Sequence, residues 1–588
     1  MRVQTDGIKR HTQPFEFRFD GKTIDAYPGD TIASALIASG ILGFCVNRQG
    51  EQRGVFCGMG VCGDCRVLIG GRSRRACVEP ARENLEVSRY PSRPTALSRE
   101  PDKKSSRWRE LRPDVLIVGA GPAGLSAAKV AAAAGLDVLV VDERHKAGGQ
   151  YFKQPSDGFD VDFTKVDARF AEGHELMLEV QDAGARFIFG ATVWGTFAPN
   201  RVAISTDEHT TVIDPRQLIL SPGAYERTLP VPGWTLPGFL TAGAAQTLLR
   251  ANQTAVGRRV LVAGHGPLNM QVAHELAAAG TSVAAVAEIA AAPYTAAPGA
   301  LFGMIFNAPQ LSFTGLAQLA SLRRKRVPVR YRHVLVGAEG GERVRRAVIA
   351  RIDARGRPVA GTQEKFDVDA ICVNYGFLPQ SELARSLGCQ FRYDNRTGNL
   401  DAVRGDDGRT NVENVFVVGD AGGMGGALIS MDQGTLAGLS VVAALRPSFE
   451  VASKRSQHER SLRRHRKFQD ALWRVFDAPY IGARLAAPST PICRCEGINK
   501  IDIESCLTVD QRDFGSVKRA TRLGMGRCQG RYCSTLLASL MSDMLGHQCD
   551  MEEFFAPRAP FKPVPVMQLA GEYGKALTPV DLLQSRDE

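Results

Sequence analysis

The stretch DVLIVGAGPAGLSAAKVAAAAGLDVLVVDER, Asp114 to Arg144, decides the fold of this 588-residue chain. An apolar run, Val115–Val118, leads into a glycine-rich turn, an alanine-rich segment and a second apolar run. This order predicts a β-strand, a tight turn, an α-helix and a second strand. The glycines follow G-x-G-x-x-G: the first makes the turn, the second admits a pyrophosphate and the third packs helix on strand. The stretch therefore predicts a dinucleotide-binding α/β domain.

The residues that follow the second strand supply the ribose contact in such a site. Asp142 and Glu143 both stand there, and a carboxylate at this place binds the adenosine ribose. We favour Glu143, because ERHKAGGQ resembles the segment after this acid in glutathione-reductase-like flavoproteins. The candidate contacts are, in chain order, Gly119, Gly121, Pro122, Ala123, Gly124, Asp142, Glu143, Arg144, Gly149 and Gln150.

Two later segments indicate which dinucleotide is bound. NVFVVGDAGGMGGALISMDQGTLAG, Asn414 to Gly438, resembles the segment of two-dinucleotide flavoproteins whose aspartate contacts the FAD ribityl chain. Gly419 and Asp420 hold that place, and a helix N-terminus after them would face the pyrophosphate. LILSPGAYERTLPVPG, Leu218 to Gly233, resembles the crossing strand that closes the FAD domain. The three signals together predict FAD.

A second strand–turn–helix pattern, RRVLVAGHGPLNMQVAHELAAAG, lies between those segments. Gly264 and Gly266 fit the motif, but Asn269 stands at the third glycine position, and Glu288 ends the next strand, where an acid suits NAD. The fold of a nicotinamide domain is expected, and its occupancy is left open, because the domain could be retained for shape alone. Cys372 and Cys389 are isolated here, so a dithiol shuttle has no residues to use.

The N-terminal region predicts a small β-grasp domain. FEFRFDGKTIDAY reads as a hairpin turning at Asp20-Gly21, and PGDTIASALIASG reads as a helix capped by Asp30 or Thr31 and ended by Gly40. Its cysteines follow C-x4-C-x2-C-x11-C, the plant-type spacing of a [2Fe-2S] cluster. Zinc is the rival ligand, although zinc sites usually pair C-x2-C knuckles. The predicted ligands are Cys57, Cys62, Cys65 and Cys77, with Cys45 outside the spacing.

A second cysteine group lies near the other end of the chain, in PICRCEGI and GMGRCQGRYC. The spacing C-x-C-x32-C-x4-C resembles the bacterioferritin-associated-ferredoxin-like [2Fe-2S] domain, whose ligands sit in short loops before helix starts. Helix N-termini favour thiolates and an anionic cluster. Zinc remains a stronger rival here than at the first group. The predicted ligands are Cys493, Cys495, Cys528 and Cys533, with Cys506 and Cys549 outside the spacing.

Composition and two unusual segments bear on partners. No charged residue occurs from Ile289 to Leu322, and Arg323–Arg326 are all basic, but prolines interrupt the stretch. We expect a surface covered by a partner subunit, with peripheral membrane contact as the second interpretation. Ser453–Phe476 reads as a basic linker helix packed on the flavin domain, with a docking surface as the alternative.

The net charge of +11 is spread along the chain without an aromatic-interleaved basic patch, so nucleic acid is not an expected partner. The opening residues MRVQTDGIKRHTQPFEF carry no apolar signal core. A cytoplasmic location is therefore expected, with association at the inner face of the membrane as its variant.

Order and motifs together resemble the large subunit of the multisubunit amine and amino-acid dehydrogenases. That family includes heterotetrameric sarcosine oxidase, opine dehydrogenases, D-hydroxyproline dehydrogenase and hydrogen cyanide synthase. FDGKTIDAYPGDTIASALIASG, GAGPAGLSAA, VAGHGPLN, VVGDAGG and GRCQGRYC carry the resemblance over nearly the whole chain. In several of those complexes the plant-type ferredoxin is a separate subunit, so the chain resembles a fusion of two subunits.

The resemblance implies a division of labour. In that family the substrate is oxidised on a partner β subunit with its own FAD, and electrons pass through flavin, sometimes FMN at the interface, to the clusters. It implies that this chain is the electron-transferring α subunit. Its partners would be the β subunit, which carries FAD, together with an electron acceptor, either a small molecule or the respiratory chain through quinone. The substrate, opine, hydroxyproline, sarcosine or glycine-like, would be chosen by the other polypeptide.

The expected fold class is α/β: a glutathione-reductase-like flavoprotein with two dinucleotide-binding domains, an N-terminal β-grasp ferredoxin domain and a C-terminal small helical ferredoxin domain. Two other functions stay open, a self-contained NADH-dependent reductase using Gly264 and Glu288, and an assembly scaffold whose nucleotides are structural. The expected divisions are 1–100 for the ferredoxin domain, 112–256 and 369–450 for the FAD domain, 257–368 for the NAD-like domain, 451–485 for the linker helix and 486–588 for the second cluster domain with the tail.

Overall fold

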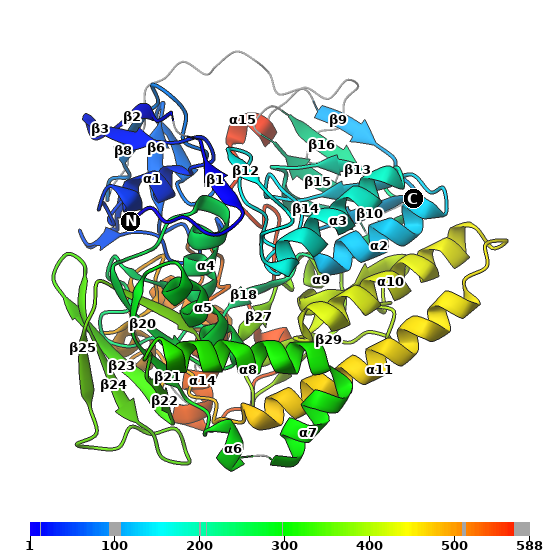
Figure 1. Ribbon diagram of the computed structural model, residues 1–588. Coiled ribbons are helices and arrows are strands. Elements are labelled where there is room, and N and C mark those ends of the chain that lie inside the picture. Colours follow the sequence, from blue (N-terminus) through cyan, green and yellow to red (C-terminus); the bar gives the residue numbers. More distant parts are fainter. Residues whose placement is uncertain are drawn as a thin grey trace.

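The computed structural model describes residues 1–11, 13–92, 108–198, 201–206, 209–296, 298–507 and 513–569. Four parts can be followed by colour in Figure 1, with the N-terminal domain in blue, the flavin domain largely in cyan, the second dinucleotide domain in green and the C-terminal domain in orange and red. The predicted α/β fold class is confirmed.

The flavin domain is built on a parallel sheet in the order β13-β11-β10-β17-β30. Its last strand comes from a distant part of the chain, so the sheet is built from two separate segments. Helices α2 and α10 pack closely together on this sheet. The bounds are Val115–Val118 for β10, Val138–Val141 for β11, Arg186–Ile188 for β13, Gln217–Leu220 for β17, Val415–Val417 for β30, Pro122–Ala133 for α2, Ala168–Asp182 for α3 and Gly426–Leu445 for α10.

A smaller sheet, in the order β14-β15-β16-β9, lies beside the flavin domain. Its strand β9 precedes residue 112, so this part of the chain begins earlier than the expected start at residue 112. The preceding residues up to 107 lie outside the described ranges, but Trp108–Leu111 form β9. β9 pairs in parallel with β16, and Trp108 packs on Val212. The other bounds are Thr192–Ala198 for β14, Arg201–Ser205 for β15 and Thr210–Ile213 for β16.

The second dinucleotide domain has a parallel sheet in the order β19-β26-β20-β21-β22. This corrects two domain boundaries, since β19 lies inside 112–256 and β26 inside 369–450. Short apolar runs fit either sheet, so their composition could not assign them. The bounds are Phe239–Thr241 for β19, Arg259–Gly264 for β20, Ser282–Glu288 for β21, Val329–Tyr331 for β22, Ala370–Asn374 for β26, Ala242–Asn252 for α4 and Pro267–Ala278 for α5.

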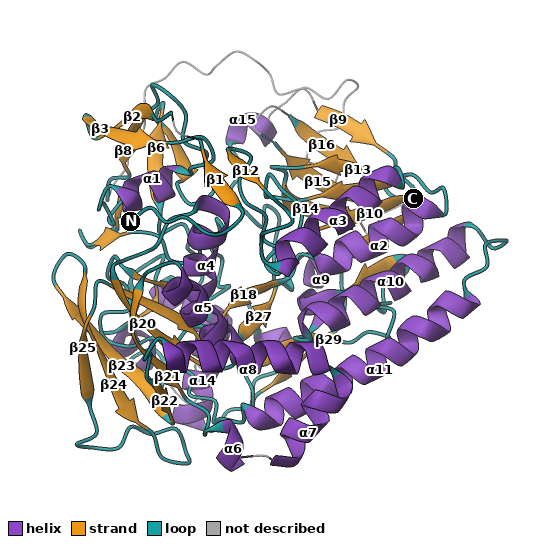
Figure 2. Cartoon of the chain, in the orientation of Figure 1, coloured by secondary structure: helices purple, strands orange, loops and turns teal. Residues whose placement is uncertain are grey.

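Further strands surround these sheets. A separate layer of β23, β24 and β25 projects from the second dinucleotide domain (Figure 2). β18 pairs with β27 and β28 with β29 between the two domains. The bounds are His333–Gly340 for β23, Val344–Arg351 for β24, Glu364–Asp367 for β25, Ala224–Glu226 for β18, Phe377–Pro379 for β27, Phe391–Asp394 for β28, Asn399–Ala402 for β29 and Glu382–Ser386 for α9.

The N-terminal domain has a five-stranded sheet in the order β3-β2-β8-β6-β7 beside α1. Thr31, rather than Asp30, caps α1, because its hydroxyl accepts the backbone N–H of Ser34 at 3.1 Å. A first strand, β1, instead pairs with β12 of the flavin domain. The bounds are Ile8–Arg10 for β1, Phe15–Phe19 for β2, Lys22–Ala26 for β3, Ile32–Ala38 for α1, Cys45–Val46 for β4, Gln52–Arg53 for β5, Arg66–Ile69 for β6, Arg72–Arg75 for β7, Glu86–Arg89 for β8 and Phe159–Val161 for β12.

The apolar stretch 289–322 forms helices α6, α7 and α8, and α7 packs on the basic helix α11 (Figure 1). Phe302, Phe306 and Phe313 are exposed by 73%, 78% and 61%, so a large apolar surface faces outward. Among the described residues, one helix, α10, is long and apolar enough to cross a membrane, and 72% of its apolar window is buried inside the protein. The bounds are Pro293–Ala296 for α6, Pro298–Asn307 for α7, Pro309–Arg324 for α8 and Ala452–Val475 for α11.

The C-terminal domain is small and mostly helical. Its last helix, α15, returns to the small sheet of the flavin domain, where the Gln568 carbonyl accepts hydrogen bonds from the side chains of Trp108 and Thr210. The bounds are Pro491–Cys493 for β31, Ile498–Asn499 for β32, Lys500–Glu504 for α12, Phe514–Thr521 for α13, Ser534–Leu545 for α14 and Val566–Leu569 for α15.

Candidate flavin and iron–sulfur sites

The first glycine turn leaves no room for a side chain at its first and third glycines. Gly119 has φ +106°, and a Cβ there would lie 2.3 Å from the carbonyl oxygen of Ser221. A Cβ on Gly124 would lie 1.9 Å from the carbonyl oxygen of Gly119. Gly121 is the N-cap of α2, with Pro122 in its first turn and Ala123 next. The turn therefore presents bare backbone at a helix N-terminus, which fits a pyrophosphate.

The two acids after β11 have different surroundings. Asp142 accepts the backbone N–H groups of Ala120 at 2.7 Å and Arg144 at 2.8 Å, so it fixes the turn from behind. Burial raises its pKa. Glu143 instead pairs with Arg75 of the N-terminal domain, at 2.8 Å, and with Lys562 of the C-terminal segment. Burial alone would raise the pKa of Glu143, but Lys562 and Arg75 outweigh it and lower it to about 2.

The remaining predicted FAD contacts differ in exposure. A Cβ on Gly149 would lie 2.8 Å from the Cα of Gly121, so the two loops touch through glycines, whereas Gln150 is exposed. The Oδ1 atom of Asp420 accepts the backbone N–H groups of Gly425 at 3.0 Å and Gly426 at 2.9 Å, at the start of α10. Gly419 and Asp420 thus lie in a short 3-10 turn, Gly419–Gly422, directly before the long buried helix α10, which packs beside α2.

A buried polar group that the sequence analysis missed lies between the two dinucleotide domains. Lys153 is 3% exposed and donates to Gln246 Oε1 at 2.7 Å. Burial is the main reason that the pKa of Lys153 falls to about 7. Glu226 accepts the backbone N–H of Gly243 at 2.8 Å and the amide of Asn374 at 2.9 Å. In the sequence, only the position of this lysine, three residues after Gln150, could have drawn attention to it. No sequence pattern predicts which residues it contacts.

The second glycine turn is closed. Glu288 is fully buried and accepts the backbone N–H groups of Gly266 and Ala290, each at 3.0 Å. The ring of Trp473, from α11, stacks on His265 with centroids 6.0 Å apart, and it lies 3.9 Å from where a Cβ of Gly266 would stand. Glu288, the acid expected to bind a ribose, is therefore bonded to backbone N–H groups of its own domain, and the ring of Trp473 lies over the turn.

The first four predicted cluster ligands converge in a buried loop. Cys57 interacts with the thiols of Cys62 and Cys77, and these contacts lower its pKa. The contacts of Cys77 with the thiols of Cys57 and Cys65 in turn raise the pKa of Cys77. A Cβ on Gly58, whose φ is +60°, would lie 2.8 Å from the Cα of Ala244, so the loop sits directly on α4. Four enclosed sulfurs with close backbone fit a [2Fe-2S] cluster.

The second four also converge. The thiol of Cys495 donates to Cys528 Sγ at 3.3 Å, and Cys493 interacts with both Cys495 and Cys533, which lowers the pKa of Cys493. Cys533 is the N-cap of α14, and its contact with the Cys493 thiol, together with burial, raises the pKa of Cys533. All four sulfurs are available to one metal centre, and the donor set fits a [2Fe-2S] cluster or zinc.

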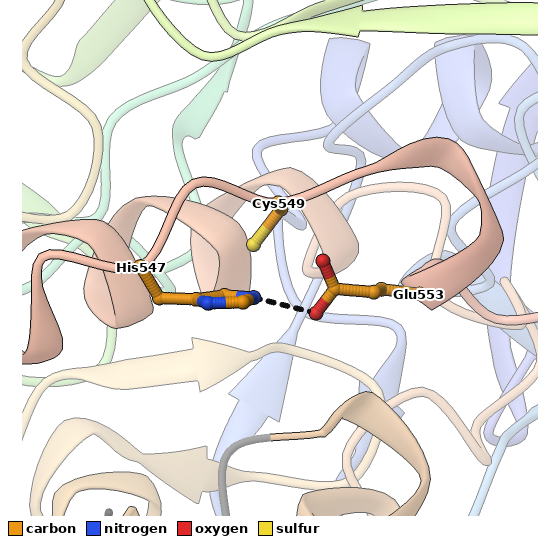
Figure 3. Close-up of side chains that lie close together, drawn as sticks. All are labelled: His547, Cys549 and Glu553. Carbon is orange, nitrogen blue, oxygen red and sulfur yellow. Dashed lines mark hydrogen bonds and ion pairs between the residues drawn. The ribbon is translucent and has the colours of Figure 1, made fainter.

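A third group holds Cys549, which lies outside both spacings. His547 Nε2 and Glu553 Oε2 form an ion pair of 2.7 Å beside the Cys549 thiol (Figure 3). Burial raises the pKa of Cys549 to about 12, so the thiol is protonated. The ion pair between His547 and Glu553 accounts for the arrangement of these side chains, so no bound metal is needed to explain it.

Comparisons with known proteins agree with this geometry. The family described as pyridine nucleotide-disulphide oxidoreductase matches residues 113–434, a 2Fe-2S iron-sulfur cluster binding domain matches 12–91, and the sarcosine oxidase A3 domain matches 491–572. The chain therefore uses FAD and a [2Fe-2S] cluster.

Relatives that match about three quarters of the chain are named as subunits of enzymes. Hydrogen cyanide synthase subunit HcnB of Pseudomonas protegens is 30% identical over 76% of this chain and 96% of its own. An opine oxidase subunit of Agrobacterium tumefaciens is also 30% identical, over 78% of this chain and 91% of its own. The crystal structure of L-proline dehydrogenase from P. horikoshii shares the fold, with a TM-score of 0.70 at 20% identity, over 95% of this chain and 98% of that one.

The chain is thus a flavin-dependent oxidoreductase subunit of the same kind as these relatives. It belongs to the pyridine nucleotide-disulphide oxidoreductase family, in the group that contains hydrogen cyanide synthase subunit HcnB and the opine oxidase subunit of Agrobacterium tumefaciens.

Proposed function

We propose that the chain is the electron-transferring subunit of an amino-acid or amine dehydrogenase complex, with substrate oxidation on a partner flavin subunit. The observation that carries this is the contact between the first cysteine loop and the FAD motif: Arg75 Nη1 donates to the Gly60 carbonyl in that loop and to Glu143, each at 2.8 Å. The first cysteine loop is thus tied to the acid after β11.

The residues have separate tasks in this proposal. The backbone of Gly119–Gly124 and the start of α10 would hold the pyrophosphate of FAD, Glu143 would bind its ribose, and Asp420 would contact its ribityl chain. Cys57, Cys62, Cys65 and Cys77 would hold one [2Fe-2S] cluster, and Cys493, Cys495, Cys528 and Cys533 would hold a second. Bound flavin accepts electrons in pairs and iron–sulfur clusters carry them singly, so the combination converts one to the other.

The closed second turn supports this proposal over a self-contained NADH reductase. A nicotinamide dinucleotide needs an open glycine turn and a ribose acid, whereas Glu288 is enclosed and Trp473 stands against the turn. The proposal includes a cytoplasmic location and a partner on the exposed phenylalanines of α7 and α8, because an apolar surface of this kind is usually covered. FMN at that interface belongs to the same proposal.

Purification of the native complex tests the proposal. We expect a second flavin subunit to co-purify, iron to reach the content of two clusters, and an amine or imino acid to reduce the flavin and then the clusters under anaerobic conditions. Purified chain alone, mixed anaerobically with NADH, should not lose its flavin absorbance. Rapid bleaching by NADH would instead favour the self-contained reductase, and zinc in place of iron would contradict the relay.

A further inference from the structure

The two cysteine groups, far apart in the sequence, lie directly against each other. The Sγ atom of Cys495 stands 3.8 Å from the carbonyl oxygen of Cys62, so a ligand residue of the second group touches a ligand residue of the first. Aromatic residues next to the ligands pack across the same boundary, with the rings of Phe56 and Tyr532 5.7 Å apart. The two cysteine loops therefore pack together in one buried region.

A buried ion pair joins the loops at this boundary. Asp64 lies between Cys62 and Cys65, and Arg494 lies between Cys493 and Cys495. The Nε and Nη2 atoms of Arg494 donate to Asp64 Oδ2 at 2.8 and 2.7 Å, and Nη1 donates to the carbonyl of Trp234. The side chains are 5% and 6% exposed.

The surroundings fix the arginine from both faces. Its guanidinium lies 3.8 Å from the ring centroid of Phe56 and 4.7 Å from that of Trp234. A planar guanidinium held by two hydrogen bonds to one carboxylate oxygen, a carbonyl and two rings has one orientation. Removing two charges from water costs free energy, so a buried ion pair adds little net stability to the fold. Its main effect at this place is to fix the two loops relative to each other.

We propose that Arg494 and Asp64 are positioning residues that hold the two cysteine loops in contact, so that the two clusters form one electronically coupled pair. The inference rests on the proposed function, because it requires both cysteine groups to carry [2Fe-2S] clusters. Neither side chain ligates iron; each fixes the loop that carries the ligands on its two sides.

The test uses the purified, cluster-loaded full chain, reduced with dithionite and measured by electron paramagnetic resonance. Two reduced clusters in close contact split each other's signals, and the dipolar part of this splitting falls with the inverse cube of their separation. We expect wild-type protein to show the splitting. We expect the Asp64→Asn/Arg494→Met double variant, which leaves no unpaired buried charge, to keep both clusters and lose the splitting.

A matched control lies at the same boundary. Arg48 of the N-terminal domain pairs with Glu496, the neighbour of Cys495, at 3.1 Å, but its side chain is 60% exposed. Arg48→Gln should keep the splitting of the wild type, because exposed ion pairs constrain geometry weakly.

The outcomes separate the two proposals. Wild-type protein without two clusters, by iron content and spectra, would overturn the proposed function before any variant is compared. Two clusters without splitting in the wild type would overturn the inference, as would an unchanged splitting in the double variant or an equal loss in Arg48→Gln. Loss of iron from the double variant would also overturn it, because the pair would then serve cluster binding rather than spacing.

Discussion

The two glycine turns of this chain start from the same local pattern and end in opposite states. The first, Gly119–Gly124, keeps a bare helix N-terminus and leaves Glu143 on cross-domain partners. In the second, Asn269 replaces the third glycine, Glu288 bonds to its own turn and Trp473 packs over it. The difference teaches that a strand–turn–helix motif predicts a fold but does not by itself predict a nucleotide site, because at the second turn the acid is already bonded to backbone N–H groups and a distant helix lies over it.

The largest expected effect follows from crowding the first turn. Gly124→Val should abolish FAD binding, because even a Cβ at this position would overlap the Gly119 carbonyl. FAD and iron contents of the purified protein measure this, and retained iron shows that the cluster domains remain folded. Gly266→Ala is the comparison in the second turn, at the position that corresponds to Gly121, where φ is +96° and the nearest atom to a Cβ is 3.9 Å away. It should keep the FAD, and equal loss of FAD in both variants would remove the distinction between the turns.

A smaller effect on FAD binding is expected from changing the acids Glu143 and Glu288. Glu143→Gln should weaken FAD binding about 10-fold, since a hydrogen bond to a charged group contributes about 1.5 kcal/mol. Titration of FAD into protein stripped of flavin gives the dissociation constant. Glu288→Gln should leave that constant unchanged, because the backbone partners of Glu288, Gly266 and Ala290, both belong to the second dinucleotide domain. An unchanged constant in Glu143→Gln would assign the ribose to another group.

Lys153, which lies between the two dinucleotide domains, should make the stability of the protein depend on pH. The pKa of Lys153 is lowered from 10.5 to about 7, so the unfolded chain binds an extra proton between these values. The cost of burying Lys153 is therefore full below about pH 7 and vanishes as the pH rises toward 10.5. Lys153→Met should stabilise the protein by on the order of 2 kcal/mol at pH 6 and by less at pH 9.

Thermal unfolding of the variant and the wild type at both pH values checks this. Lys129→Met removes an exposed lysine paired with Glu179 and should give no pH-dependent difference. A gain from Lys153→Met that is equal at pH 6 and pH 9 would contradict the assignment of a lowered pKa.

The smallest effect concerns the aromatic cover. Trp473→Ala should cost about 1 kcal/mol, because Trp473 is partly exposed and loses mainly its stacking on His265. Anaerobic NADH should still not bleach the flavin, since Glu288 remains bonded to the backbone. Bleaching in this variant alone would show that the second turn is competent and merely covered.

The sequence predicted what is local. The strand–turn–helix of Asp114–Arg144, the hairpin at Asp20-Gly21 and the grouping of the cysteines depend on neighbouring residues, so they could be read directly. The contacts made across domains could not: the partners of Glu143, the ion pair of Arg494 with Asp64 and the cover formed by Trp473 join segments with no spacing rule. Trp108–Leu111 escaped prediction because a four-residue edge strand carries two charges.

Both ends of the described chain return to the flavin domain. β1 pairs with β12 near the start, and near the end Phe561 donates its backbone N–H to the Trp194 carbonyl while Lys562 reaches Glu143. The central sheet also waits for β30 before it is complete. The flavin domain is therefore completed by residues from both ends of the described chain and by a strand that follows the whole second dinucleotide domain, so its folding depends on most of the chain.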